Sequence, residues 1–321
     1  MHRQITALIL LFASLVFPGG AAARLPAPYG TLYPFTLVAA TNWNGDPAGA
    51  NDWNCKPSAE HPYPVVLVNS TFLTASVNWT SVSPYLRNRG HCVFAFNYGR
   101  QPPYDIPPGI NGIGPVADSA QETKTFIERV LAATGARKVD IVGHSQGGVL
   151  PRYVMQHLGG ADDVHRMVLL SSPFRIDAAG FGDEYEDLLY RLLKLVRPEA
   201  YQLLADIAPI PSLVEIFTPY FWDSLNAVDH GLAHQVDFVQ ITSKWDEMYL
   251  LAGTTPPVGA SNARTYYVQD AQLGEWVPCL ADFSTHFAIP YTRRAVAMIG
   301  NALDPAHAVD PPCDVVPFYS P

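Results

Sequence analysis

A serine flanked by small residues constrains the fold of this chain more than any other feature. The five-residue turn that contains it lies directly after the β-branched run Lys138 to Val142 and directly before a helical stretch from Gly148 to Leu158. A nucleophilic serine on so tight a strand-to-helix turn needs unusual backbone angles and leaves no room for side chains two positions to either side. We therefore expect Ser145 to be a nucleophile held at the end of a strand. The turn consists of Gly143, His144, Ser145, Gln146 and Gly147.

Strand-like and helix-like segments alternate around this turn. A clear helical period runs from Ser119 to Thr134, begins at an Asp118-Ser119 cap and ends at Gly135. Shorter helical patterns cover Ser81 to Arg89 and Tyr291 to Asn301. The other strand-like runs are Val65 to Asn69, Cys92 to Asn97, Val164 to Leu170, Val236 to Thr242 and Arg264 to Gln269. This alternation predicts an α/β fold whose mostly parallel sheet has helices on both faces.

An insertion at about residues 174–235 interrupts the alternation and predicts a helical cap over one end of the sheet. Its helix Asp183 to Arg197 has an apolar face that includes Leu189, and Pro198 ends it. Two interpretations of the cap stay open: its apolar side chains pack on the sheet, or some of them line a pocket for acyl chains. The second group is Leu213, Val214, Ile216, Phe217, Phe221 and Trp222.

The first 23 residues have the pattern of a signal peptide, with Arg3, a 13-residue apolar run from Ile5 to Phe17, and small residues up to Ala23. We expect cleavage near Ala23 and secretion; an uncleaved anchor is the alternative. The remainder, 24–321, is predicted to be a single domain.

Secretion would expose the four cysteines to an oxidising compartment, where an even number favours two disulfides. Sequence alone permits three pairings. We predict Cys55 with Cys92 and Cys279 with Cys313, because each neighbouring pair closes a loop of similar length.

Composition and spacing exclude some functions. With 29 acidic and 20 basic residues, the formal net charge is −9 and no long basic run occurs, so we expect no nucleic-acid partner. The cysteines lack the close spacing of a zinc site, and we expect neither a metal nor a cofactor.

A serine nucleophile needs a histidine base and an orienting acid, and both should follow it in the chain. His286 lies in a loop after the last strand-like run, whereas His230, His234 and His307 are less well placed. Asp246, four residues after a strand-like run, is the preferred acid. Asp270 and Asp282 are the other candidates.

An oxyanion hole should take one backbone N–H from Gln146, the residue after the nucleophile. The second should come from the loop after an early strand. That loop is Asn69-Ser70-Thr71, and Thr71 is the candidate.

With these residues, the chain resembles the secreted class 2 lipases typical of actinobacteria and, more distantly, yeast lipase B. The resemblance rests on Pro64 to Val68 leading into a Thr-Phe loop, on Cys92 to Gly99, on Gly143 to Gly148 and on Asn301 to Pro305. It implies an α/β-hydrolase fold and carboxylic-ester hydrolysis through an acyl-enzyme. Its implied site residues are the triad Ser145, Asp246 and His286 and the oxyanion donors Thr71 and Gln146.

Two departures from the family pattern stand out. Asn69-Ser70 replaces the usual His-Gly, so a serine stands where glycine permits a positive φ, which we expect to alter the loop. Ser172-Pro173-Phe174-Arg175 replaces an Asn-His-Gly segment, which bears on substrate preference. Asn69-Ser70-Thr71 is also an N-glycosylation sequence, as is Asn78-Trp79-Thr80, and Asn78 is the better acceptor of the two.

The expected substrate is a lipid or another ester. We expect the protein to be a monomer that makes transient contact with a lipid surface. The alternatives are an esterase for short-chain or polyester substrates and a non-catalytic binding module with the same fold.

Overall fold

The central sheet places the predicted elements in one parallel array. The computed structural model describes residues 23–30, 37–104, 109–174, 210–217, 219–227, 235–248, 263–270 and 278–318. Within these residues six strands form one parallel sheet, in the order β2-β1-β3-β4-β5-β6. The strands are β1 (Val65–Val68), β2 (Val93–Ala95), β3 (Val139–His144), β4 (Val164–Leu170), β5 (Asp237–Thr242) and β6 (Ala263–Tyr267). The predicted fold class is confirmed.

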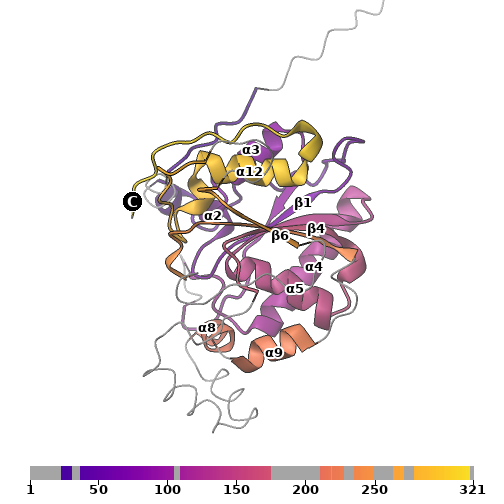
Figure 1. The fold of residues 1–321 in the computed structure, drawn as a ribbon. Helices are drawn as coiled ribbons and strands as arrows, with labels where there is room; N and C mark the ends of the chain where they lie inside the picture. The colour runs from indigo at the N-terminus through magenta and orange to yellow at the C-terminus, as the bar shows by residue number, and fades with distance from the viewer. Residues whose placement is uncertain are drawn as a thin grey trace, which may run out of the picture.

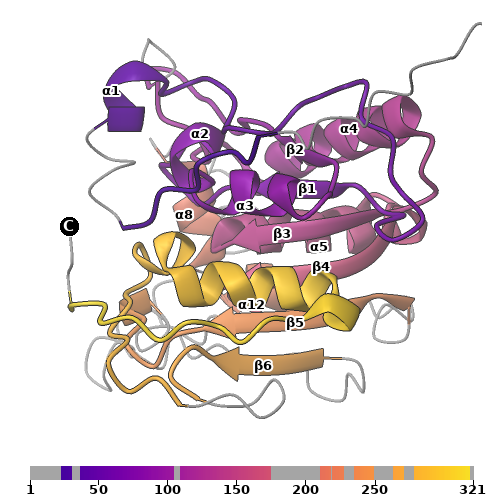
Figure 2. The same cartoon turned by 90° about the horizontal axis from the view of Figure 1, so that it is seen from above.

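Helices cover both faces of this sheet (Figure 1; Figure 2). Helices α3 and α12 lie on one face, and α4 and α5 lie on the other, where α8 and α9 pack against them. The described helices are α1 (Ala39–Thr41), α2 (Ala75–Asn78), α3 (Val82–Asn88), α4 (Val116–Thr134), α5 (Gln146–His157), α8 (Pro211–Ile216), α9 (Pro219–Ala227) and α12 (Arg293–Leu303), with 3-10 turns η2 (Ala161–Asp163), η4 (Ile289–Tyr291) and η5 (Pro305–His307).

The core is divided between the two faces because successive side chains of a strand point to opposite sides. In β1, Val66 and Val68 belong to the cluster under α4 and α5, whereas Val65 and Leu67 belong to the cluster under α12. All four are fully buried. This explains why β1 is a continuous apolar run rather than an alternating one.

The start of helix α4 differs from the sequence prediction. The helix begins at Val116 rather than at an Asp118-Ser119 cap, and its N-cap residue is Pro115, which has no side-chain hydrogen bond to the helix. Its end agrees with the prediction, since Gly135 takes a left-handed conformation with φ 75°. The N–H at this earlier start is bound by a carboxylate from a distant part of the chain, described below with helix α8.

Several predictions lie outside the described residues. The signal-peptide segment does, apart from Ala23, and so does most of the cap, including the predicted helix over 183–197. Helices α8 and α9 lie within the range that the sequence predicts as the cap. No helix in the described part of the chain is long and apolar enough to cross a membrane.

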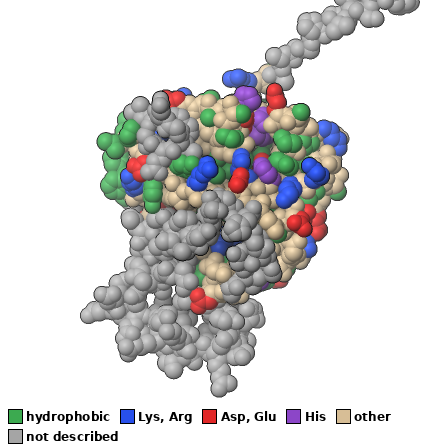
Figure 3. Space-filling model, turned by 45° about the vertical axis from the view of Figure 1, so that its right-hand side comes forward, with side chains coloured by type: hydrophobic (Ala, Val, Ile, Leu, Met, Phe, Trp, Pro, Cys, Tyr) green, Lys and Arg blue, Asp and Glu red, His purple; other side chains and the backbone are tan. Residues whose placement is uncertain are grey.

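The two cysteine pairs form disulfides in the expected pairing, Cys55 with Cys92 and Cys279 with Cys313. The first ties the N-terminal segment to the start of β2, and the second ties the loop before His286 to the C-terminal segment. On the face seen in Figure 3, acidic and basic side chains are interspersed with apolar ones, and its described residues form no extended basic area.

Candidate active site

Ser145 sits on a strained turn between β3 and α5. Its φ and ψ are 54° and −124°, a combination that few residues other than glycine adopt. Its backbone N–H donates to the Leu170 oxygen at 3.0 Å, and the Ser172 hydroxyl donates to the Ser145 carbonyl at 2.7 Å. The end of the neighbouring strand β4 thus holds this conformation in place.

The two glycines of the turn lie where a side chain would clash. A Cβ on Gly147 would come within 1.9 Å of the Val68 carbonyl oxygen at the end of β1. A Cβ on Gly143 would come within 2.5 Å of the Gly147 oxygen. Backbone atoms cannot yield as a flexible side chain can, so this turn requires glycine at both positions.

His286 and Asp246 form a buried pair at the same edge of the sheet. The His286 Nδ1 lies 2.9 and 3.0 Å from the two carboxylate oxygens of Asp246, and the side chains are 6% and 1% exposed. A carboxylate accepts hydrogen bonds, so this contact places the imidazole proton on Nδ1 and leaves Nε2 able to accept one.

The other candidates for base and acid are placed differently. Asp270 pairs with Lys244, at 2.5 Å from its Nζ, and Asp282 accepts a hydrogen bond from the Ser284 backbone N–H at 2.9 Å. His307 pairs with Asp304 at 3.0 Å. His230 and His234 lie outside the described residues. Among the described candidates, His286 and Asp246 are therefore the pair that the fold brings together.

Two residues that the sequence analysis missed hold this pair in position. Glu247 accepts a hydrogen bond from the His286 backbone N–H at 2.9 Å. Gln269, buried beyond the end of β6, donates both to the Ser243 hydroxyl and to the Asp282 carbonyl, at 2.9 and 2.7 Å. It thereby joins the loop before Asp246 to the loop before His286. Neither residue belongs to a local pattern that would have revealed it.

His144 links the nucleophile strand to the His286 loop. Its Nε2 lies 3.0 Å from the His286 carbonyl oxygen, and its Nδ1 lies 3.1 Å from the side-chain oxygen of Asn78. The ring is fully buried. Burial, with a smaller contribution from His286, lowers the pKa of His144 to about 3. We expect this ring to be neutral and to act as a structural support.

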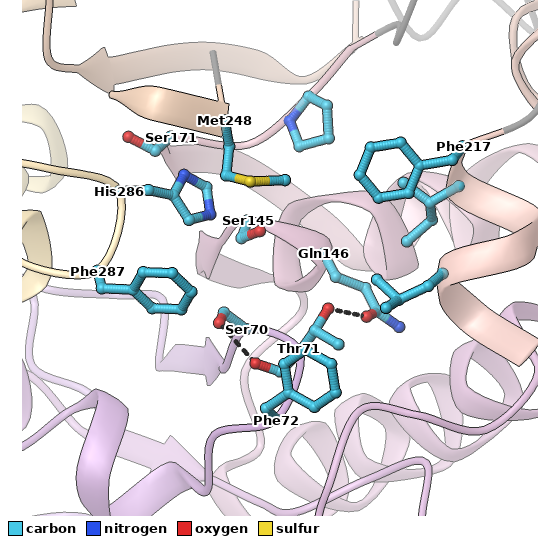
Figure 4. Close-up of a pocket in the computed structure, with 13 residues that line it drawn as sticks. Ser70, Thr71, Phe72, Ser145, Gln146, Ser171, Phe217, Met248, His286 and Phe287 are labelled. Atoms are coloured by element: carbon cyan, nitrogen blue, oxygen red, sulfur yellow. Dashed lines mark hydrogen bonds between the residues drawn. The ribbon is translucent and has the colours of Figure 1, made fainter. Parts of the chain in front are cut away.

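Thr71 and Gln146 meet where the loop after β1 reaches the start of α5. The Thr71 hydroxyl donates to the side-chain oxygen of Gln146, which joins the two segments (Figure 4). The Gln146 N–H is the first of helix α5, where no intrahelical acceptor is available. On either side of Thr71, the N–H groups of Ser70 and Phe72 are bound to Asn78 Oδ1 and Asn111 O.

The structure corrects two expectations for this loop. Positive φ occurs at Phe72, with 69°, and not at Ser70, so the strain lies one residue after Thr71. Asn69 and Asn78 are both fully buried, and the Asn78 side-chain oxygen accepts the Ser70 N–H at 2.8 Å. Because a glycan needs an exposed asparagine, neither residue can be an acceptor in this fold.

An apolar pocket opens over Ser145 and His286 (Figure 4). Its volume is about 210 Å³. The figure shows the His286 ring beside Ser145, with Phe217 and Phe287 on opposite sides. Of the four non-glycine residues with positive φ in the described chain, three line this pocket. The pocket residues are Ser70, Thr71, Phe72, Ser145, Gln146, Ser171, Pro173, Leu213, Ile216, Phe217, Met248, His286 and Phe287.

Residues 62–174 match the family of class 2 lipases. Two curated triacylglycerol lipases, from Pseudarthrobacter phenanthrenivorans and Burkholderia plantarii, are each 30% identical to this chain over 137 residues. The match covers 41% of this chain and 38% and 34% of those proteins, so it spans little more than a third of their length. These findings confirm the resemblance to class 2 lipases over the segment that holds the Thr71 loop and the Ser145 turn.

Two solved structures share the fold at low sequence identity. Aspergillus fumigatus lipase B matches 97% of this chain and 64% of its own, with a TM-score of 0.52 and 17% identity. The mature form of Bacillus licheniformis lipase BlEst2 matches 77% of this chain and 94% of its own, with a TM-score of 0.50 and 16% identity. Together with the parallel sheet, they identify the fold as that of the α/β-hydrolases.

Proposed function

We propose that this protein is a serine hydrolase that cleaves carboxylic esters of lipids through an acyl-enzyme on Ser145. The observation that carries the proposal is that a strained serine, a histidine and an apolar pocket meet at one site, and that a buried carboxylate orients the histidine. The similarity of residues 62–174 to class 2 lipases supports the same chemistry.

In the proposed mechanism, the Ser145 Oγ attacks the ester carbonyl carbon while His286 Nε2 takes the hydroxyl proton. Asp246 accepts the Nδ1–H and stabilises the imidazolium that forms. The tetrahedral intermediate collapses, the C–O bond to the alcohol breaks, and the alcohol leaves with the proton from Nε2. Water, activated by the same nitrogen, then attacks the acyl-enzyme and releases the acid.

The negative charge on the carbonyl oxygen requires donors that are in place beforehand. We assign this role to the backbone N–H groups of Gln146 and Thr71. The support is the helix-start position of Gln146, and the bonds that already occupy the N–H groups on both sides of Thr71. Neither the proposed mechanism nor the donors require a metal or a cofactor.

A short-chain esterase is the second candidate function. The pocket volume of about 210 Å³ exceeds by little the ~150 Å³ apolar cavity that holds one benzene molecule. The apolar wall from helix α8 and the exposed Phe72 and Phe287 at the mouth, 37% and 41% exposed, favour a longer acyl chain and contact with a lipid surface.

The rest of the proposal concerns the whole protein. We propose a secreted, monomeric single-domain enzyme, 24–321, with a helical cap at about 174–235. Two disulfides support an oxidising compartment.

The decisive experiment combines labelling with a substrate series. A fluorophosphonate probe should label the wild-type protein at Ser145 and leave Ser145→Ala unlabelled. p-Nitrophenyl esters from two to eighteen carbons then separate a lipase from a short-chain esterase by the chain length at which kcat/KM is highest. A folded wild-type protein that takes no label and hydrolyses none of these esters would leave a non-catalytic binding module as its function.

A further inference from the structure

Helix α8 lines the pocket with one side and is attached to the segment before α4 by another. Leu213, Ile216 and Phe217 face the pocket. Ser212 and Glu215, three residues apart and therefore neighbours on another side of the helix, are buried against the loop that leads into α4. One side of this short helix therefore lines the pocket, and the other attaches the helix to the rest of the protein.

Glu215 caps a helix 99 residues away in the sequence. Its carboxylate accepts a hydrogen bond from the Val116 N–H at 2.6 Å. Val116 is the first residue of the 19-residue helix α4, which follows Pro115 and has no side-chain cap of its own. A carboxylate at the start of a helix satisfies a free N–H and interacts favourably with the helix dipole. Glu215 therefore does for α4 what a local N-cap normally does.

Further bonds attach α8, among them one from the Ser212 backbone N–H to the Ile113 carbonyl at 3.4 Å. The Ser212 hydroxyl donates to the Gly112 carbonyl at 3.0 Å. At the other end, the buried Trp222 of α9 donates from its indole N–H to the Ile216 carbonyl at 2.7 Å. Helix α8 is thus held at its first turn, through Ser212, and at its last two residues, Glu215 and Ile216.

The segment before α4, which accepts the Ser212 hydroxyl and donates the Val116 N–H to Glu215, also supports the proposed oxyanion loop. The Asn111 carbonyl accepts the Phe72 N–H at 2.9 Å, and a Cβ on Gly112 would lie only 3.1 Å from the Thr71 Cα. The segment 111–116 therefore touches Thr71 and Phe72 on one side and helix α8 on the other. It sets the distance between the place where the ester carbonyl would bind and the wall that the acyl chain would follow.

We propose that Glu215 is a positioning residue that fixes helix α8 relative to the oxyanion loop and thereby sets the preference for acyl chain length. The proposal rests on the proposed ester hydrolysis. Long acyl chains would contact α8 along Leu213 and Phe217, whereas an acetyl group would stay near Ser145. Release of α8 should therefore weaken long-chain turnover and leave short-chain turnover largely intact.

The test compares Glu215→Ala, Glu215→Gln and Asp118→Ala by the ratio of kcat/KM for p-nitrophenyl octanoate to that for the acetate. Glu215→Ala should lower this ratio by about tenfold, the effect expected for one lost charge-assisted hydrogen bond. Glu215→Gln keeps an acceptor for the Val116 N–H and should restore most of the ratio. Asp118→Ala removes an exposed carboxylate from the first turn of α4 without touching α8, and the ratio should not change.

Hydrogen exchange of the α8 amides provides a readout that does not depend on activity. Exchange in residues 212–216 should be faster in Glu215→Ala and unchanged in Asp118→Ala. If Glu215→Ala does not fold, Ser212→Ala should give a smaller change of the same kind in both readouts. Equal losses on both esters, or unchanged α8 exchange, would overturn the proposal. A wild-type protein without esterase activity would refute the proposed function, while α8 exchange would still test the attachment.

Discussion

The turn that carries Ser145 and the pocket wall formed by α8 line the same pocket but are built in different ways. The turn consists of five consecutive residues. Its glycines leave space for the Val68 carbonyl at the end of β1 and for the turn's own backbone, and the Leu170 carbonyl of β4 accepts the Ser145 N–H. Helix α8 depends on a carboxylate that caps a helix 99 residues away, and on a tryptophan of the next helix. The comparison shows that one site can combine a part that is recognisable from consecutive residues with a part that depends on residues far apart in the sequence.

The largest effect should come from the groups proposed to do the chemistry. His286→Ala should lower kcat by about 10⁶-fold and Asp246→Asn by about 10⁴-fold, because the residues of such a triad act as a unit. Asp270→Asn is the matched control and should change the rate little, because Asp270 pairs with Lys244 at the surface. Steady-state hydrolysis of p-nitrophenyl butyrate measures all three. A collapse in Asp270→Asn with normal turnover in Asp246→Asn would move the acid to Asp270.

The next effect tests how strictly the turn depends on its own residues. Gly147→Ala places a methyl group against the Val68 carbonyl and should lower the free energy of unfolding by about 3 kcal/mol or more. Gly135→Ala is the control: its φ is 75° and no atom lies within 4 Å of the added Cβ, so only the backbone cost of about 1 kcal/mol applies. Urea unfolding followed by circular dichroism gives both values. Similar losses in the two variants would show that close packing is unimportant at the turn.

The smallest effect concerns the pocket wall. Phe217→Asp should lower kcat/KM for octanoate esters by roughly tenfold more than for acetate esters, because an acyl chain would lose apolar contact with α8. Leu280→Asp, at a residue that is 78% exposed and outside the pocket lining, should leave the ratio unchanged. Circular dichroism checks that both variants are folded. A parallel loss on both esters in Phe217→Asp would remove α8 from the substrate-binding argument.

The sequence predicted most of the sheet, because its strands are short runs rich in β-branched, aromatic or other apolar residues that alternate with helical patterns. Strand β4 has the predicted bounds, and β3 extends two residues further than predicted, to His144. The start of α4 was predicted three residues late, since the Asp118-Ser119 pair looks like a cap and the true partner, Glu215, is distant in sequence. Local patterns therefore describe elements well and their long-range attachments poorly.

The site divides in the same way. Residue types and spacing predicted Ser145 as nucleophile and His286 as base, while three aspartates were candidates for the acid, with Asp246 preferred. The fold brings Asp246 to His286 and turns Asp270 towards Lys244. Gln269 and Glu247 hold the two loops, and no local sequence pattern indicates that role for either residue.

By itself, the sequence determined where the Ser145 turn lies, because the five residues that form it are consecutive and include glycine at 143 and 147, where a Cβ would meet backbone atoms. The tertiary structure alone decided which aspartate faces His286, that the positive φ falls on Phe72 rather than Ser70, and that Glu215 caps α4. The physical reason is that hydrogen bonds and charge contacts between distant segments depend on where the sheet brings those segments, and no local pattern contains that information.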